Sequence, residues 1–447
     1  MKTSKKIERW QKEYQFIKGY AKMYKLRNTL IALALAVRYH DGQYRDGGEP
    51  YIIHPLMVCK SLIRLNLEKC LQDWYPEKDA SEIRHECDIM YAVAILHDVI
   101  EDCKLPDRGR ELVKIYNLNE EVWKIVWILT KPPKKKKWPW SPVYNPERYF
   151  GNIQKNWKAI LIKLADRANN CSTMEVFDEE RKKKYILETI KYYYPLCSKG
   201  KVMYPEFLDA ITILENIIVS SIEAFASILG MQEVITDETE EYMKTVYYIK
   251  GACANEMPNT YKALFVALKF HQGQKRTSGD PFVIHPLRVC SYLLTLEIRD
   301  DCACAAALLH EIPQRCYLPE NGEELIRDYD IDREVIDVVR LVSNKNKPLA
   351  EYYEGIEKNV SALLEKLSNR VHTCTFLASA SEEDMIAYIG ETKNYMEPMC
   401  RYGLMHYPEY ANQIEIMQEH IQSICNIIEA VTKKKKQSET GLTSQGS

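Results

Sequence analysis

The sequence predicts an all-α protein, and three observations support this fold class. Apolar residues recur at i, i+3, i+4 and i+7 in stretches such as 120–131, 181–197 and 412–431, which is the spacing of one helix face. Alternating apolar and polar residues bounded by turn signals, the pattern of β-strands, are almost absent. The apolar stretch YAVAILHDVIED at 91–102 favours a buried helix.

Composition sets the broad class. The 447 residues are enough for two domains with full cores, and the net charge of −2 gives no general attraction to nucleic acid or anionic membranes. The N-terminal residues MKTSKKIERWQKEY lack the apolar core of a signal peptide. The apolar run at 31–37 is too short to span a bilayer. The 14 cysteines form no C-x-x-C pair, so we expect reduced thiols and a cytoplasmic protein.

A long internal repeat divides the chain. Residues 36–59 match 267–290, residues 94–103 match 307–316, and residues 163–171 match 366–374, each block ending on cysteine. The three blocks in one order predict a duplicated domain, with a period far too long for a solenoid. We expect the first copy at 1–230, a linker at 231–255, the second copy at 256–430 and a disordered polar tail at 431–447. The two copies should pack against each other, and a homo-oligomer stays open.

Four residues of the first copy form a set with metal-binding chemistry: His54, His97, Asp98 and Asp166. Two imidazoles and two carboxylates suit one divalent cation. The pair His97–Asp98 lies in the apolar stretch described above, where burying a charge is costly unless that charge is satisfied. A metal ion is the simplest way to satisfy it.

Three linked motifs within residues 36–174 carry a family resemblance. HDGQYRDGGEPYIIHP (40–55), LHDVIED (96–102) and IKLADRANN (162–170) together resemble the hydrolase domain of the RelA/SpoT family, a branch of the HD phosphohydrolases. The resemblance implies a tandem HD-domain fold and manganese-dependent removal of the 3′-pyrophosphate of ppGpp and pppGpp. It implies His54, His97, Asp98 and Asp166 as metal ligands, Glu101 and Asp102 as the acidic pair that handles the attacking water, and Arg45, Lys163, Arg167 and Asn170 as substrate-binding residues.

The spacing gives separate support to the acidic pair. Glu101 and Asp102 follow the ligands by one helical turn, so they should lie over His97 and Asp98 and accept a proton from metal-bound water. The chain departs from the family pattern at Asp46, where a basic residue is usual, and at Asn169, where histidine is usual. Both positions lie near the nucleotide in the family's pockets, so the base and phosphate pattern of the substrate stay open. His40 is expected to be structural.

The second copy keeps two imidazoles and changes the rest. His285 and His310 remain, whereas Glu311, Asn369, Gln314 and Arg315 replace Asp98, Asp166, Glu101 and Asp102. The loss of an anionic ligand and of the acidic pair predicts that this copy does not catalyse. Lys275, Arg276 and Arg315 would suit an anionic nucleotide without a metal, and a purely structural role is an equal alternative.

The leading functional prediction is a stand-alone alarmone hydrolase that yields GDP or GTP and pyrophosphate. No segment outside the two copies is long enough for the family's synthetase domain, so we expect no synthesis. A second hypothesis keeps the mechanism and changes the substrate to ppApp or NADPH. A third is a nucleotide-sensing regulator that uses the second copy. The lysine-rich loop at 131–146, with Trp138 and Trp140, is interpreted as a solvated loop, with an active-site lid as the alternative.

Overall fold

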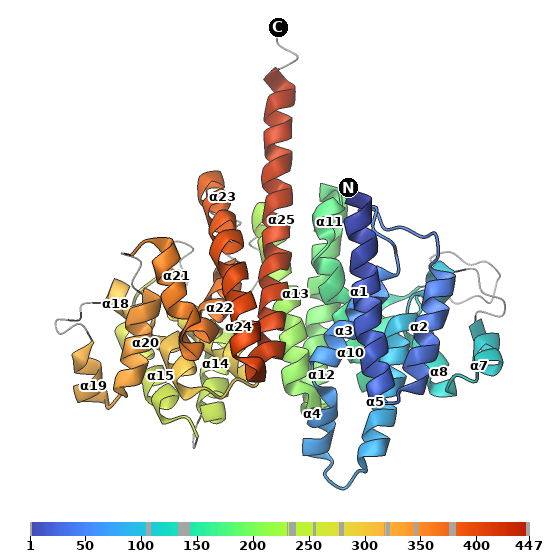
Figure 1. Cartoon of the computed structure of the whole chain (residues 1–447), viewed down its shortest axis with the longest axis horizontal. Coiled ribbons are helices and arrows are strands. Elements are labelled where there is room, and N and C mark those ends of the chain that lie inside the picture. The colour runs from blue at the N-terminus through green and yellow to red at the C-terminus, as the bar shows by residue number, and fades with distance from the viewer. Residues whose placement is uncertain are drawn as a thin grey trace. The chain divides into compact units, whose positions relative to one another are not determined.

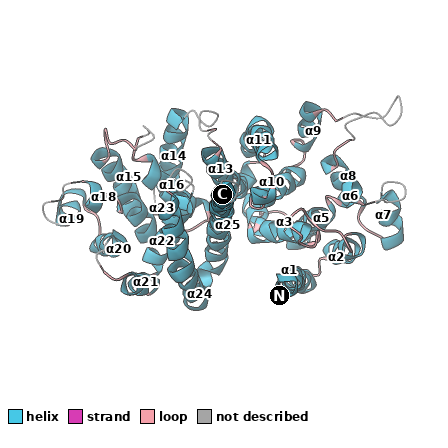
Figure 2. Ribbon diagram, turned by 90° about the horizontal axis from the view of Figure 1, so that it is seen from above, coloured by secondary structure: helices cyan, strands magenta, loops and turns pink. Residues whose placement is uncertain are grey.

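The protein is described from a computed structural model that covers residues 2–103, 109–132, 144–229, 231, 238–253, 256–276, 281–316, 318, 322–343, 347–374 and 381–443. Within these ranges the chain is helical and forms no strand, apart from isolated bridges at Tyr44–Pro50 and Lys275–Pro281 (Figure 2). The predicted all-α class is confirmed. Among the described helices, none combines the length and apolar character needed to cross a membrane.

The chain divides into two compact units, residues 1–218 and 219–447. In Figure 1 the first unit runs from blue to green and the second from green to red. The main helices of unit 1 are α1 (Lys2–Met23), α2 (Arg27–Tyr39), α3 (Ile53–Arg64), α4 (Leu67–Trp74), α5 (Ala80–Leu96), α6 (Val99–Asp102), α7 (Arg110–Tyr116), α8 (Glu120–Leu129), α9 (Pro146–Ile153), α10 (Trp157–Cys171), α11 (Glu179–Glu188), α12 (Tyr194–Met203) and the start of α13 (Leu208–Ile228).

Unit 2 begins within α13. Its further helices are α14 (Glu238–Cys253), α15 (Pro258–Phe270), α16 (Ile284–Thr295), α17 (Asp301–Leu309), α18 (Ile312–Arg315), α19 (Glu323–Tyr329), α20 (Arg333–Ser343), α21 (Leu349–Glu357), α22 (Val360–Cys374), α23 (Glu382–Glu391), α24 (Glu397–His406) and α25 (Ala411–Thr443).

Helix α5 is the centre of unit 1. Its residues 87–96 are all buried, and a helix that is apolar on every side must lie inside the protein. It packs against α2, α3, α8 and α10. Helix α17 has the same place in unit 2, where it contacts α15, α16, α20 and α22.

The two units share one order of helices. From α15 onward, unit 2 repeats the succession of short and long helices that starts at α2, and both units contain a π-helical turn, at Thr189–Tyr193 and at Thr392–Met396. Helix α4 lacks a counterpart, because the second copy has fewer residues between its first two motifs. This correspondence supports the duplication that the sequence predicts.

A capping aspartate is also present in both units, buried in unit 1 and half-buried in unit 2. In unit 1, the Asp88 carboxylate accepts bonds from the backbone N–H groups of Asn28 and Thr29, at 2.9 and 2.8 Å, at the start of α2. In unit 2, Asp301 accepts from the N–H groups of Asn259 and Thr260 in the same way, at 2.9 and 2.7 Å. These bonds satisfy N–H groups that have no partner within the helix.

The chain differs from the predicted boundaries at three places. The division falls at residue 218 rather than 230, and the segment expected as a linker contains α14, which packs against α15 and α16 through buried residues such as Ile249 and Cys253. The segment expected as a disordered tail is helical to Thr443 as part of α25. Its lysine, glutamine and glutamate residues are good helix formers, which explains the continuation.

Candidate functional site

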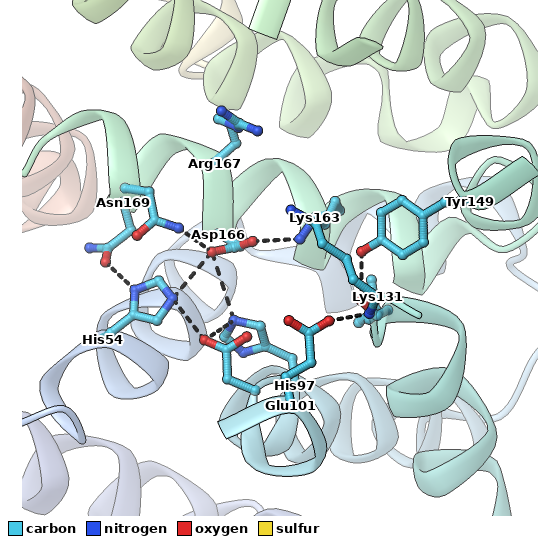
Figure 3. A network of polar contacts seen from close by, with 12 residues as sticks. His54, His97, Glu101, Lys131, Tyr149, Lys163, Asp166, Arg167 and Asn169 are labelled. Carbon is cyan, nitrogen blue, oxygen red and sulfur yellow. Dashed lines mark hydrogen bonds and ion pairs between the residues drawn. The ribbon is translucent and has the colours of Figure 1, made fainter. Parts of the chain in front are cut away.

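Three parts of unit 1 bring the four predicted ligands together. His54 lies in the first turn of α3, His97 and Asp98 lie at the junction of α5 and α6, and Asp166 lies in α10 (Figure 3). The sequence predicted one continuous helix through His97–Asp98, but α5 ends at Leu96 and the single turn α6 starts at Val99. The interruption places the pair at a helix end, where His97 is buried and Asp98 is half-buried.

The ligand atoms converge on one point. His54 Nε2 lies 3.4 Å from Asp98 Oδ2 and 3.2 Å from Asp166 Oδ1. His97 Nε2 lies 3.3 and 3.8 Å from the same two oxygens. The imidazoles and Asp166 are buried, with at most 6% of any of these residues exposed.

The hydrogen bonds fix which nitrogen of each histidine faces this point. His97 Nδ1 lies 2.8 Å from the carbonyl oxygen of Ala94, which can only accept, so Nδ1 carries the proton. His54 Nδ1 donates in the same way to Asn169 Oδ1 at 2.6 Å. In the neutral imidazoles, both Nε2 atoms therefore offer lone pairs toward Asp98 and Asp166, which is the usual arrangement of metal-binding histidines.

The residues fit a divalent cation. The ligand atoms of His54, His97 and Asp166 all lie within 4.8 Å of one another, and His97 Nε2 is buried without a hydrogen bond. Burial opposes a charged imidazolium, yet the carboxylates of Asp98 and Asp166 outweigh this effect and raise the pKa of His97 to about 9. The carboxylates thus attract positive charge to this point, and a bound cation would supply it in place of the protons.

Asp166 is held by neighbours on its own helix. Lys163 Nζ donates to Asp166 Oδ2 at 2.8 Å, and Asn170 Nδ2 donates to Asp166 Oδ1 at 2.6 Å. The three residues share one face of α10 because they are three and four positions apart. Lys163 is buried and its ammonium group orients Asp166, while its role in substrate binding stays a prediction.

Arg45 and Asn170 lie together at the edge of the site. Arg45 donates to Asn170 Oδ1, which joins the guanidinium to the Asp166 network. The loop that carries Arg45 turns at Gly48, whose φ of +71° favours glycine and whose N–H donates to the Arg45 carbonyl at 2.7 Å. The structure thus brings these two predicted substrate residues beside the predicted metal ligands.

Arg167, predicted to bind substrate, points away from the four predicted ligands. It follows Asp166 by one position, which rotates its side chain about 100° around α10 and away from the ligands, as Figure 3 shows. Only 2% of the residue is exposed. Its guanidinium donates to Glu188 and Thr189 at 2.8 and 3.1 Å and lies over the rings of Tyr185 and Tyr193. Arg167 therefore binds the protein's own π-helical turn, and its assignment to substrate stays a prediction that these contacts do not support.

The two carboxylates of the acidic pair, Glu101 and Asp102, contact different parts of unit 1. Glu101 accepts a hydrogen bond from the backbone N–H of Lys131. Asp102 lies one turn after Asp98, and the Tyr51 hydroxyl lies 2.8 Å from Asp98 Oδ2 and 2.5 Å from Asp102 Oδ2. Both residues are exposed as a whole, but desolvation of the carboxylate raises the pKa of each. Raised pKa values suit groups that accept a proton during a reaction.

Sequence reasoning missed two residues of the site. Tyr51 contacts both Asp98, a predicted metal ligand, and Asp102, and its ring stacks on that of buried His40. The family resemblance places Asn169 near the nucleotide. In the structure its side-chain oxygen contacts His54 Nδ1 and orients that imidazole. Tyr51 was visible within the motif PYIIHP, but no spacing rule links it to Asp102. The loop at 131–146, interpreted as a solvated loop with an active-site lid as the alternative, falls largely on residues 133–143, outside the described residues.

The corresponding residues of unit 2 also gather. His285 Nε2 and His310 Nε2 lie 3.2 Å apart, and Glu311 Oε1 lies 3.8 and 3.6 Å from them. Arg315 Nε donates to Glu311 Oε2 at 2.8 Å. Asn369 donates to Glu365 at 3.3 Å, and Gln314 donates to the Ser343 carbonyl at 3.2 Å. Lys275 and Arg276 lie in the loop before α16.

Comparison with known proteins concerns unit 1. Residues 32–202 match the HD domain family. The chain is 34% identical over 168 residues to a guanosine-3′,5′-bis(diphosphate) 3′-pyrophosphohydrolase of Aquifex aeolicus, covering 38% of this chain and 21% of the relative. It is 30% identical over 163 residues to the protein of that name in Vibrio cholerae, covering 36% and 20%.

A relative with another name matches to a similar extent. The GTP pyrophosphokinase of Streptomyces coelicolor is 27% identical over 205 residues, covering 42% of this chain and 21% of the relative. The chain thus spans about a fifth of the length of these curated relatives.

Proposed function

We propose that this protein, whose residues 32–202 form an HD domain similar to that of RelA/SpoT-type (p)ppGpp 3′-pyrophosphohydrolases, hydrolyses the 3′-pyrophosphate of guanosine alarmones. The observation that carries the proposal is the pair of buried Nε2 lone pairs aimed at Asp98 and Asp166. The products would be GDP or GTP and pyrophosphate.

His54, His97, Asp98 and Asp166 would hold the divalent cation, for which we propose Mn²⁺. When bound, such an ion lowers the pKa of a coordinated water and draws electron density from a phosphate group. The chain's own residues orient this set: Asn169 and Ala94 fix the two imidazoles, and Lys163 and Asn170 fix Asp166.

Glu101 and Asp102 would manage the protons. The attacking water oxygen forms a bond to the phosphorus atom while the bond from phosphorus to the ribose 3′ oxygen breaks. One of the two carboxylates takes the proton of the water, and the carboxyl group so formed gives a proton to the leaving 3′ oxygen, which becomes a hydroxyl. Desolvation raises the pKa of both carboxyl groups, which makes each a stronger base than a fully hydrated carboxylate.

Arg45 and Asn170 would bind the substrate beside the cation. The family's usual basic residue after the arginine is replaced by Asp46, but Arg181 pairs with Asp46 at 2.7 Å and brings a compensating positive charge from α11. The rim of the site thus keeps its cationic side chains, which favours a phosphate-bearing ligand.

A turnover assay tests the proposal. The full chain with Mn²⁺ is offered ppGpp, ppApp or NADPH, and pyrophosphate and phosphate release are measured. We expect pyrophosphate from ppGpp, at least a thousandfold less of it in Asp98→Asn, and unchanged release in the unit 2 variant His310→Ala. Release of phosphate from NADPH, or of pyrophosphate from ppApp alone, would identify another substrate. The proposed active site would stay the same.

Two outcomes would contradict the proposal. Nucleotide binding without turnover of any of the three compounds would favour the sensor hypothesis. We also propose that the protein does not synthesise alarmones. Because some relatives are named GTP pyrophosphokinases, the chain is also incubated with ATP and GTP, and formation of pppGpp would refute this second part.

A further inference from the structure

In unit 2, His285 and His310 form a hydrogen bond with each other through their Nε2 atoms. His310 Nδ1 donates to the Ala307 carbonyl at 2.9 Å, so Nε2 of the neutral imidazole is an acceptor. His285 Nε2, 3.2 Å away, must then donate to it. His285 Nδ1 in turn accepts from His372 Nδ1 at 2.6 Å. In this order of protons, neither Nε2 has a lone pair left for a cation, in contrast to unit 1.

The carboxylate of this cluster is also satisfied without a metal. Arg315 Nε donates to Glu311 Oε2 at 2.8 Å, and Asn369, which replaces Asp166, carries no charge. The guanidinium lies 4.0 Å from the ring centroid of Phe282, which replaces Tyr51. Unit 1 has a hydroxyl between two carboxylates at this place, whereas unit 2 has an arginine stacked on a phenyl ring. The two substitutions are physically coupled.

The charge of the site is inverted as a result. The positions of Arg45, Asp98, Glu101, Asp102, Lys163 and Asp166 in unit 1 hold four carboxylates and two cations. The matching positions of unit 2 hold Arg276, Glu311, Gln314, Arg315, Lys366 and Asn369, which are one carboxylate and three cations. Glu365, at the position of Ile162, adds a further carboxyl group, but it is fully buried and burial raises its pKa, which favours the uncharged form.

Arg315 keeps donors for a ligand. Its side chain is 49% exposed, and among the described residues its Nη groups have no polar partner, because Glu311 takes only Nε. A guanidinium with two available Nη groups matches the oxygens of a phosphate. We infer that Arg276 and Arg315 of unit 2, which both lie over the Phe282 ring, bind a phosphate or pyrophosphate group without a metal ion. The inference does not depend on the hydrolysis proposed for unit 1.

Calorimetric titration of the full chain with inorganic pyrophosphate in EDTA tests this inference. Without a cation, the carboxylates of unit 1 repel the probe, so binding reports on unit 2. We expect one saturable site whose affinity falls at least tenfold in Arg276→Gln and in Arg315→Gln. Arg45→Gln, the matched change in unit 1, and Arg333→Gln, an exposed arginine of unit 2, should leave the affinity unchanged.

Folding and metal binding are checked separately. Circular dichroism melting identifies variants that unfold, and the double variant Glu311→Gln/Arg315→Gln removes the guanidinium without leaving an unpaired carboxylate. It should lose pyrophosphate binding as Arg315→Gln does. Elemental analysis after dialysis against Mn²⁺ or Zn²⁺ should find one equivalent of metal, lost in Asp98→Asn and kept in His310→Ala.

Three results would overturn the inference. The first is no pyrophosphate binding by the native chain in EDTA. The second is an equal loss of affinity in Arg45→Gln, which would place the anion in unit 1. The third is a second equivalent of metal that disappears in His310→Ala, which would make unit 2 a metal site. If the protein does not hydrolyse alarmones, the inference still holds. The titration measures binding in EDTA, where metal-dependent hydrolysis does not take place.

Discussion

Asn169 controls a histidine tautomer through a single oxygen atom. Its Oδ1 accepts from His54 Nδ1 at 2.6 Å and so leaves Nε2 free for the cation. Asn169→Ala removes this acceptor, and loss of such a partner typically weakens metal affinity by about 10–100-fold. We expect a loss of this size for Mn²⁺, measured by calorimetry of the full chain.

Two further variants control the Asn169 prediction. Asn169→Asp keeps an acceptor oxygen at the same position and should retain affinity within a few-fold. Asn152→Ala changes an exposed asparagine of α9 and should have no effect. Equal affinity in Asn169→Ala and the native chain would show that the second histidine nitrogen needs no partner here.

Arg167 is predicted to stabilise the fold and not to bind substrate. Its buried guanidinium pairs with Glu188 and lies between two tyrosine rings. Arg167→Gln leaves Glu188 without its cation, so we expect the free energy of unfolding to fall by about 3 kcal/mol or more. Urea titration measures this change, and KM of the remaining folded enzyme should not move.

Arg45→Gln, in contrast to Arg167→Gln, should change KM and leave the free energy of unfolding almost unchanged. This residue lies at the edge of the site and donates to Asn170, so the variant should raise KM about tenfold with little change in unfolding. A raised KM and unchanged stability in Arg167→Gln would instead show that Arg167 binds substrate.

At the scale of the elements, the capping aspartates join helices that are distant in sequence. Asp88 and Asp301 each satisfy two backbone N–H groups at the start of α2 or α15. Replacement by alanine leaves these groups without partners, which should cost about 3 kcal/mol in either unit. Urea unfolding of Asp88→Ala and Asp301→Ala measures this cost, with the exposed α5 cap variant Asp79→Ala as a control that loses about 1 kcal/mol or less. A loss of stability in only one of the two variants would argue that α2 and α15 are not equivalent.

His420 of α25 joins three helices of unit 2 and makes that unit sensitive to acid. It contacts Ser220 Oγ at 2.5 Å and Tyr292 at 3.1 Å, and burial lowers its pKa to about 3. Below about pH 6.5 the unfolded chain binds a proton that the folded chain does not. Stability should therefore fall by up to about 1.4 kcal/mol per pH unit until the pH approaches 3.

The variant His420→Gln isolates this contribution. Other groups titrate in the same range, so the comparison is between the pH slopes of the two proteins in urea unfolding at pH 7, 6 and 5. The slope of the variant should be smaller. Identical slopes would mean that His420 is protonated in the folded state.

For the molecule as a whole, the sequence predicts what depends on composition, helical period and motif. The all-α class and the convergence of His54, His97, Asp98 and Asp166 belong to this group. The position of Arg167 depends on rotation about α10, and the role of Asn169 depends on a contact with α3, more than a hundred residues away. Such properties follow from packing between helices, which no local pattern encodes.

The two units should also differ in their response to metal. A ligand that binds the folded state at 100 times its Kd raises the free energy of unfolding by about 2.7 kcal/mol. Mn²⁺ at that concentration should stabilise the native chain by this amount relative to EDTA. Asp98→Asn should lose the effect and His310→Ala should keep it, as followed by urea unfolding. Because Arg315 neutralises Glu311, unit 2 already contains the positive charge that we propose unit 1 would obtain from a cation. Stabilisation that persists in Asp98→Asn and disappears in His310→Ala would reverse these roles.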